Sequence, residues 1–388
     1  MTETIAAPKE GGISSLLRVA SVARDRPDAI PALADAIGTE ALDLVLLMVS
    51  PGADLSALIA KAALAFGGAR VVGCTTAGEI DATGYAEGRI LATGFPRSHF
   101  VSQSLLVPDL DAYDRQAIID RMIRARDELA AAEPDWDDEF NFLAIDGLST
   151  REDRFAADIA LGLGAVPLFG GSAGDNVAFG ETFVFHEGRA HGNAAILTQF
   201  RTRCPVKVFK TDHLVPTDRR MVVTGADPEA RVVHEINAEP AAREYARILG
   251  FDPEQLDTFT FAAHPVVVKI GGQHHVRAIQ RVADNGDLVF FSAIDEGLVL
   301  NLAEPRDMAE HLAREMARLA ENGPPDVVLA CDCILRRIEA ERTQSVGALS
   351  QILSDNRVVG FSTYGEQFNS MHVNQTLTGV AIYPPREG

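Results

Sequence analysis

The chain has 388 residues, 47% of them apolar and 23% charged, which is the balance of a globular protein of two or three domains. Its 55 acidic residues outnumber its 35 Lys and Arg residues, and the formal net charge is −20. Such a surface repels phosphate backbones and anionic lipids, which argues against nucleic-acid binding and a membrane-surface role.

Several features of the sequence predict a cytoplasmic protein. The first residues are acidic and lack the apolar stretch of a secretory signal, and residues 1–14 are expected to be a disordered tail. The longest uncharged stretch, residues 159–174, is interrupted by glycines and Pro167, so it cannot form a membrane-spanning helix of ~20 residues. The four cysteines do not form a secreted disulfide framework in a chain of this length.

Apolar periodicity predicts strands and helices in alternation over the first part of the chain. A strand at 44–49 and a helix from Asp54 to Phe66 are expected to form a βαβ unit with the apolar run that follows. An earlier helix over 30–37 has Asp25 as its candidate N-cap and Gly38 as its stop. Further strands are predicted at 90–95, 100–107 and 142–145, and further helices near 113–130 and 152–163.

The pattern then becomes β-rich, with strands expected at 183–185, 194–200, 206–209 and 221–224. We place a domain boundary in the segment 225–228. Beyond it we expect strands at 231–236, 259–263, 266–270, 276–282, 288–293, 327–330, 357–360 and 376–383, with helices at 239–249 and 306–320 and two short ones after residue 330. The predicted fold class is α/β, with two domains of mixed sheets flanked by helices, at residues 15–225 and 226–388.

One short phrase occurs three times in the sequence. Residues 72–79 read VGCTTAGE, residues 359–366 read VGFSTYGE, and residues 169–175 give a shorter version, FGGSAGD. Each follows an apolar run that predicts a buried strand. Because the copies lie about 100 and 190 residues apart, they do not indicate a solenoid. They suggest related halves built around a shared site.

The phrases predict a ligand pocket because their glycines permit close backbone approach and their hydroxyls offer hydrogen-bond donors and acceptors. They match neither a dinucleotide fingerprint nor a Walker loop, and their terminal carboxylates would repel phosphate. The simpler interpretation is a set of tight turns with capped carboxylates. The predicted pocket residues are Thr75, Thr76, Glu79, Ser172, Asp175, Cys333, Thr363, Tyr364 and Glu366.

Other motifs weigh against catalysis and against a tetrahedral metal site. Asp146 and Ser149 could be assembled with a histidine into a hydrolase triad, but there is no Gly-x-Ser-x-Gly elbow. The segment Cys331-Asp332-Cys333 would need two further zinc ligands, and the covalent haem signature is absent. Two small residues alternating at a strand end are the favoured explanation of the cysteines on spacing alone. We therefore expect a protein that is not an enzyme.

Two histidines lie in surroundings that could suit a metal ligand. His264 follows the apolar and aromatic run 259–263, and His372 follows the third phrase. A lone histidine in an apolar run is more often a hydrogen-bonded core residue, and this alternative stays open for both.

With these residues in view, the chain resembles the FIST family of bacterial sensory proteins, which have an N-terminal FIST domain and a FIST-C domain. The first two phrases carry the N-terminal resemblance. Ile236-Asn237, Pro240, Tyr245, Leu249-Gly250, Arg277, Gly297 and Gly365-Glu366 carry the C-terminal one. The resemblance covers residues 15–383 and is specific as a combination of segments.

Within that family the chain is most similar to NosP-type nitric-oxide-sensing haem proteins. The segments 145–152, 239–242, 331–333 and 363–369 carry this similarity. It implies non-covalent haem b, nitric oxide as the gaseous ligand, and regulation of a partner histidine kinase or other two-component protein. It does not identify the iron ligand, for which we rank His264 first, His372 second and His213 third. The alternative is a FIST sensor that binds a small metabolite, such as an amino acid, without haem.

Overall fold

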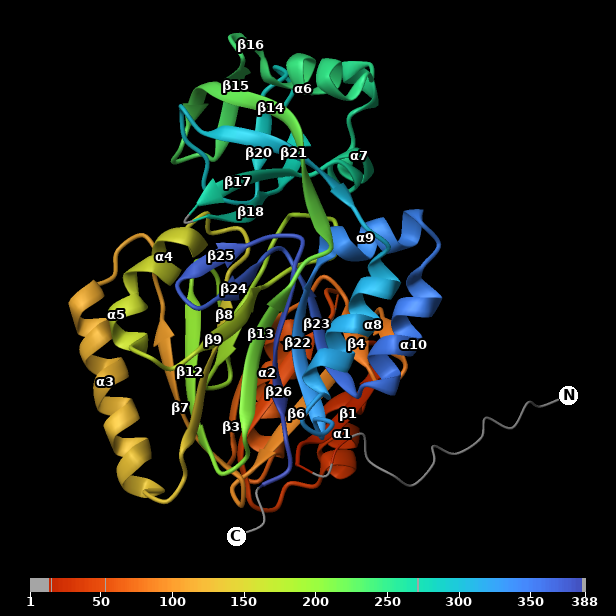
Figure 1. Ribbon diagram of the computed structural model, residues 1–388. Coiled ribbons are helices and arrows are strands. Elements are labelled where there is room, and N and C mark those ends of the chain that lie inside the picture. The colour runs from red at the N-terminus through yellow and green to blue at the C-terminus, as the bar shows by residue number, and fades with distance from the viewer. Residues whose placement is uncertain (1–13, 15, 53, 271, 386–388) are drawn as a thin grey trace, which may run out of the picture.

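The computed structural model describes residues 14, 16–52, 54–270 and 272–385, and it is α/β as predicted (Figure 1). Three six-stranded mixed sheets form a lower body, and an eight-stranded sheet forms an upper unit that lies on it. The tail predicted to be disordered, residues 1–14, lies outside the described residues except for Ser14.

The first sheet of the body contains the βαβ unit predicted from the sequence. Helix α2 (Leu55–Ala65) connects β2 to the parallel strand β3, and the Asp54 carboxylate caps it by accepting from Ala57 N at 3.2 Å. The preceding helix, α1 (Ala29–Ile37), begins after Asp28, so Asp25 is not its N-cap. The sheet order is β1 (Arg18–Ala23), β6 (Arg89–Pro96), β2 (Leu42–Val49), β3 (Arg70–Thr75), β10 (Val184–His186) and β11 (Arg189–His191).

The second and third sheets are built in the same way around parallel pairs. The second runs β7 (Phe100–Val107), β12 (Ala195–Thr202), β8 (Asp138–Ile145), β9 (Leu168–Ser172), β24 (Glu366–Phe368) and β25 (Met371–Val373), with helices α3 (Arg115–Ala132), α4 (Glu152–Asp158) and α5 (Ala160–Leu163). The third runs β13 (Val206–Thr211), β26 (Leu377–Ile382), β22 (Val327–Cys333), β23 (Val358–Thr363), β4 (Glu79–Asp81) and β5 (Gly84–Ala86), with α8 (Met308–Leu319), α9 (Ile334–Arg342) and α10 (Val346–Asp355).

The three sheets are three structural repeats that exchange hairpins in a cycle. Across each sheet, two antiparallel strands are followed by a parallel pair, and the second strand of this pair ends in a glycine phrase. In the chain, one of the antiparallel strands precedes the pair and the other comes after it. The hairpin that follows each phrase joins a different sheet: β4–β5 pairs with β23, β10–β11 with β3, and β24–β25 with β9. The expectation of two related halves is therefore wrong. Three units are interlocked, and the last is formed by the C-terminal part of the chain.

The core explains why the strands are nearly continuous apolar runs. One cluster, which includes Leu46, Phe140 and Phe361, takes residues from all three sheets and fills the space between them. The opposite face of each sheet packs against its own helices. A strand buried on both faces shows no polar alternation, which is the pattern seen in the sequence.

The upper unit is inserted into the third repeat, between β13 and α8. Its strands are β14 (Leu214–Asp227), β15 (Val232–Ile236), β16 (Glu239–Pro240), β17 (Val266–Ile270), β18 (Gln273–Arg277), β19 (Ile279–Val282), β20 (Leu288–Phe290) and β21 (Val299–Pro305), with α6 (Ala241–Leu249), the turn η1 (Pro253–Gln255) and α7 (Thr258–Ala263). The chain enters and leaves through a two-stranded neck, where Leu214 pairs with Pro305. Residues 225–228, the predicted domain boundary, lie at the end of β14.

The strand predicted at 259–263 is wrong, because these residues form helix α7. The Asp257 carboxylate accepts from Thr260 N at 2.7 Å and caps the helix. The alternation of Phe259 and Phe261 with smaller residues imitates a strand. In the helix these two rings point to opposite sides, with Phe261 buried and Phe259 47% exposed.

Candidate ligand-binding site

The three phrases meet at the upper end of the body, as predicted. Backbone hydrogen bonds join the first and third phrases, from Ala77 N to Ser362 O at 2.9 Å and from Ser362 N to Gly78 O at 2.7 Å. The second phrase joins the third through Ser172 N and Gly365 O at 2.8 Å. The carboxyl ends of three parallel strand pairs therefore come together, and this is where α/β sheets commonly bind ligands.

The first glycine of each phrase is required by close strand packing. A Cβ atom on Gly73 would lie 1.7 Å from the carbonyl oxygen of Leu47, and one on Gly360 would lie 1.8 Å from that of Ala330. The corresponding distance for Gly170 and Leu143 is 2.1 Å. Each glycine lies opposite that residue in the parallel ladder. The first glycine recurs in the three phrases because the same close contact between parallel strands occurs in all three sheets.

The two glutamates of the phrases have a structural role. Glu366 accepts from Thr363 Oγ1 at 2.5 Å and from Thr376 Oγ1 at 2.6 Å, and burial raises the pKa of Glu366 to about 8. Glu79 accepts from Thr76 Oγ1 at 2.5 Å and from Arg89 N at 3.1 Å, and burial raises its pKa to about 7. Both carboxyls tie a phrase to the strand that returns after its hairpin, as the capped-turn interpretation expected.

Asp175 and Tyr364 organise the loop that covers the second phrase. The Tyr364 hydroxyl donates to Asp175, whose carboxylate also accepts from Phe179 N at 2.8 Å and Gly180 N at 2.7 Å. The centroid of the Tyr364 ring lies 4.7 Å from that of Phe179 and 6.1 Å from that of Phe291, which belongs to the upper unit. These residues build the contact between the body and the upper unit.

The other predicted pocket residues are also buried and already paired. Thr75 Oγ1 accepts from Phe183 N at 3.1 Å, and Ser172 Oγ accepts from Gln367 Nε2 at 3.0 Å. Cys333 is fully buried, and burial raises the pKa of its thiol. The predicted residues therefore lie together, but their polar atoms are largely bonded to one another.

Polar atoms without partners lie immediately beside them, in the segment that follows the third phrase. In the described part of the chain, Gln367 Oε1, His372 Nε2, Asn374 Oδ1 and Gln375 Oε1 are buried and accept or donate no hydrogen bond. All four side chains are at most 4% exposed. A buried polar group left unpaired costs about 1–3 kcal/mol, so four in one segment indicate a place for a ligand.

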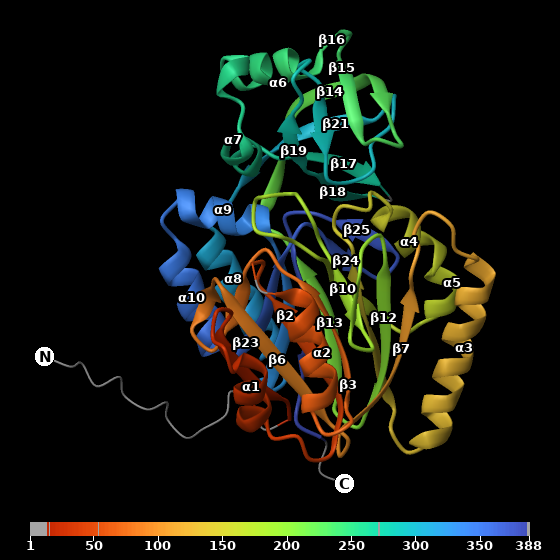
Figure 2. The ribbon, with the colours of Figure 1, turned by 180° about the vertical axis from the view of Figure 1, so that it is seen from behind.

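The upper unit contributes Arg277 to this region. Strand β18, which carries it, lies above the β24–β25 hairpin in both ribbon views (Figures 1 and 2). Arg277 Nε is buried without a partner among the described residues, and burial lowers the pKa of its guanidinium. We call Gln367, His372, Asn374, Gln375 and Arg277 the junction site. No sequence motif marks the three amide residues. Only Arg277 and His372 stand out in the sequence itself.

A buried ion-pair cluster joins the upper unit to the body. Arg231 of the upper unit donates to Glu152 Oε2 at 2.8 Å and to Asp153 Oδ2 at 3.0 Å, at the start of α4. Asp153 also accepts from Ala293 N at 2.9 Å. Arg231 has a φ of 54°, an uncommon backbone conformation for a residue with a side chain. This strained, buried contact connects the upper unit to helix α4 of the body.

The histidines proposed as iron ligands do not form a haem pocket in this structure. A Cβ atom on Gly365 would lie 2.7 Å from His372 Nε2, so the space beside this nitrogen is too small for a porphyrin. The half-buried His264 ring packs edge-on to Phe251 at 5.4 Å, and Phe259 and Phe261 do not share a face with which to line a porphyrin. His213, in the neck, is buried against Glu339, with His213 Nε2 2.8 Å from Glu339 Oε1. The surroundings of these three histidines in this structure therefore do not fit a haem group.

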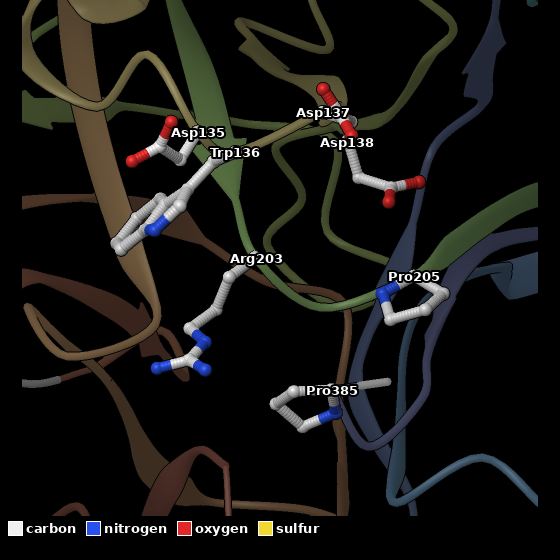
Figure 3. A pocket seen from close by; sticks show the side chains of 7 residues that line it. All are labelled: Asp135, Trp136, Asp137, Asp138, Arg203, Pro205 and Pro385. Atoms are coloured by element: carbon white, nitrogen blue, oxygen red, sulfur yellow. The ribbon is translucent and has the colours of Figure 1, made fainter. Parts of the chain in front are cut away.

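Larger cavities lie outside the junction site, and one of about 600 Å³ lies on the upper unit beside Pro216, Val268 and His274. One of about 400 Å³ is beside the first phrase and is lined by Ser50, Thr75, Asp175 and Phe183 among others. Another of about 400 Å³ surrounds Trp136, Arg203, Pro205 and Pro385 (Figure 3). The cavity around Trp136 is at the start of β8, whose opposite end, at Ile145, pairs with Ser172 of the second phrase. Between β18 and residues 373–376, the structure leaves about 20 Å³, roughly the space of one water.

Comparison with protein-family models agrees with this architecture. The FIST N domain model matches residues 43–239, and the FIST C domain model matches residues 241–369. The chain belongs to the FIST family. FIST domains are associated with small-ligand sensing in signalling proteins. A search of curated proteins finds no match to this FIST protein. Within its described residues, no helix is long and apolar enough to cross a bilayer.

Proposed function

We propose that this FIST protein is a non-catalytic sensor that binds a small polar ligand at the junction site and transmits the event to a signalling partner. The observation that carries the proposal is the set of four buried, unpartnered polar atoms in residues 367–375. They lie beneath an inserted unit whose links to the body include a two-stranded neck and a buried ion-pair cluster. A ligand in that position would contact both units at once.

The binding event would be transmitted by a movement of the upper unit relative to the body. The amide side chains of the junction site are buried, and only about 20 Å³ lies beside them between β18 and residues 373–376, so we propose that binding moves the upper unit about its neck. That motion would strain or break the contacts of Arg231 with Glu152 and Asp153. A ligand can shift this equilibrium by its differential affinity for the open and closed states. We propose a histidine kinase or other two-component protein as the partner. A basic patch on that partner would complement the acidic surface of this chain.

Haem-dependent nitric oxide sensing stays a prediction, supported by the resemblance of residues 145–152 and 363–369 to NosP-type proteins. It requires a rearrangement, because His372 Nε2 faces the Gly365 backbone and the half-buried His264 ring lacks a facing pair of aromatic rings at Phe259 and Phe261. Haem reconstitution of the full chain tests it directly. A Soret band that shifts with nitric oxide and is lost in His264→Ala or His372→Ala, but kept in His234→Ala, would favour haem over a polar ligand.

The experiment for the polar-ligand proposal is a thermal-shift screen of the full chain against small metabolites. A ligand at 100 times its Kd adds about 2.7 kcal/mol of stability, which is readily detected. The informative variant is Asn374→Leu, which removes one unpartnered oxygen and only a long hydrogen bond, from Asn374 Nδ2 to Tyr364 O at 3.5 Å. We expect it to keep or raise the stability of the free protein and to weaken ligand binding.

Asn141→Leu is the matched control for this variant. Asn141 is also fully buried, has an unpartnered Oδ1 among the described residues, and makes only 3.5 Å bonds through Nδ2. It lies near the start of β8, at the end of the body away from the junction site. Equal loss of binding in both variants would contradict the proposed position of the ligand.

A further inference from the structure

We propose that the base of the neck is a two-state latch. His213 bridges Arg336 and Glu339 of α9 while the upper unit lies on the body, and these two residues pair with each other when His213 withdraws. The inference rests on the proposed function, because it assigns the contact that changes as the upper unit moves about its neck. We call His213, Arg336 and Glu339 the neck latch.

His213 lies where the neck meets the body. It stands between β13 and β14, and its carbonyl oxygen accepts from Arg306 N, just beyond the end of β21, at 2.9 Å. The next pair along the neck is Leu214 with Pro305. The His213 side chain is fully buried. Because this residue belongs to the neck, a movement of the neck relative to α9 must carry its side chain with it.

The His213 ring stands between two opposite charges of α9. Arg336 Nη1 lies 3.1 Å from His213 Nδ1, and His213 Nε2 lies 2.8 Å from Glu339 Oε1. A guanidinium can only donate, so Nδ1 is the acceptor and the neutral ring donates its single proton from Nε2 to Glu339. Within the described residues, no ion pair joins Arg336 directly to Glu339. The ring therefore takes the place of that ion pair.

One atom of each charged group is left open. Arg336 Nη2 and Glu339 Oε2 are buried and have no hydrogen-bond partner in the described part of the chain. The two residues are three positions apart on α9 and hence lie on the same face of the helix. A donor and an acceptor buried without partners are costly, and a direct bond between them removes both costs. The neck latch thus has two arrangements, one with His213 as the bridge and one with a direct ion pair.

Contacts on the body side keep Arg336 from following His213. Arg336 Nε donates to Asp332 Oδ1 at 2.6 Å, and both side chains are fully buried. Asp332 also accepts from the hydroxyl of Tyr85, which belongs to β5 in the hairpin after the first phrase. A buried, charge-assisted bond of this kind fixes the guanidinium in the body. His213 is therefore the part of the neck latch that moves.

Helix α9 also touches the upper unit directly. It lies beneath α7 (Figure 1), and Arg342 Nη1 donates to Phe259 O at 3.2 Å. Both Arg342 and Phe259 are exposed. A change of the neck latch would therefore be accompanied by a change at an exposed contact between the two units, where a signalling partner can detect it.

The test measures the distance between the two units of the full chain by pulsed electron paramagnetic resonance. Spin labels are placed at Leu64→Cys on α2 of the body and at Arg281→Cys on β19 of the upper unit. Both positions are exposed, and the four native cysteines are buried. We expect His213→Phe, which removes both bonds of the bridge, to raise the population of a second distance relative to the first by about tenfold or more.

Glu339→Gln distinguishes a latch from a loss of packing. It removes the charge that the direct ion pair needs, so adding it to His213→Phe should lower the second population by about tenfold. If His213 has only a packing role, the added change should leave that population unchanged or increase it. His213→Gln can accept from Arg336 and donate to Glu339, so it should stay close to the native chain. His234→Phe, at a histidine of the upper unit that contacts Asp287, is the matched control and should have no effect.

A distance distribution in His213→Phe identical to the native one, or a second population that Glu339→Gln does not lower, would overturn the neck latch. His213→Leu replaces His213→Phe if that variant does not fold, with the same expected results. The thermal-shift screen measures ligand binding at the junction site independently. Absence of any ligand in that screen would remove the proposed function, whereas failure of the latch experiment alone would leave the ligand site standing.

Discussion

Replacing Gly360 with alanine tests whether the repeated phrases are a packing requirement of the three sheets. The added Cβ would lie 1.8 Å from the carbonyl oxygen of Ala330, whereas a Cβ atom essentially never lies within 3.0 Å of a heavy atom that it is not bonded to. Ala330 belongs to β22, which is paired with β23 on one side and β26 on the other. Relief of the clash must therefore disturb two strand ladders.

Overpacking a well-packed core costs about 1–3 kcal/mol, and we expect the upper end of that range here because backbone must move. For a chain of 388 residues that unfolds as one unit, about 3 kcal/mol corresponds to a fall of about 4 °C in the midpoint of thermal unfolding. Differential scanning calorimetry measures it. Gly347→Ala in α10, where nothing lies within 4 Å, is the control and should leave the midpoint unchanged or raise it by about 1 °C. A Gly360→Ala midpoint within 1 °C of the native value would refute the packing argument.

Further predictions concern the junction contact, the buried acids and the thiols. Arg231→Ala leaves Glu152 and Asp153 without their cation, so calorimetry should show a loss of about 3–5 kcal/mol; an unchanged midpoint would mean that the ion pairs do not hold the units together. The pKa of Glu366, raised by burial to about 8, lies above its value in the unfolded chain, so the native state binds the extra proton and stability should fall as pH rises from about 4.5 to 8. Glu366→Gln should flatten that part of the stability–pH curve, and an identical slope in the variant would exclude Glu366 as its source. Burial raises the pKa of the Cys331 thiol, so it should resist an aromatic disulfide reagent in native protein and react after denaturation; fast native labelling would show that the core opens.

The strands of the body were largely predictable because buried strands are apolar runs in the local sequence. Strands β2, β8 and β22 are apolar on both faces, and their glycine phrases mark where the following parallel strands end. The exchange of hairpins was not predictable in the same way. The pairing of Ile80 with Gly360 joins residues 280 positions apart, and short polar hairpins carry no signal of the sheet that they enter.

The sequence predicted that the phrases meet, and among the junction-site residues it singled out only Arg277 and His372. Thr76, Thr363 and the two glutamates lie where the phrases converge, yet they bond to one another because each turn must satisfy its own buried polar groups. Gln367, Asn374 and Gln375 become unusual only through burial beneath the inserted unit, which is a tertiary effect. Helix α7 was missed because alternating aromatic residues resemble a strand until the Asp257 cap is considered.

The most direct test of the central claim is hydrogen–deuterium exchange of the full chain with and without the compound that gives the largest shift in the metabolite screen. A ligand at the junction site should slow exchange in residues 364–376 and in β18, and it should change exchange at the start of α4, where Arg231 is bound. Protection confined to the cavity around Trp136, or to residues 50–55 and 175–183, with no change in 364–376, would contradict ligand binding at the junction site.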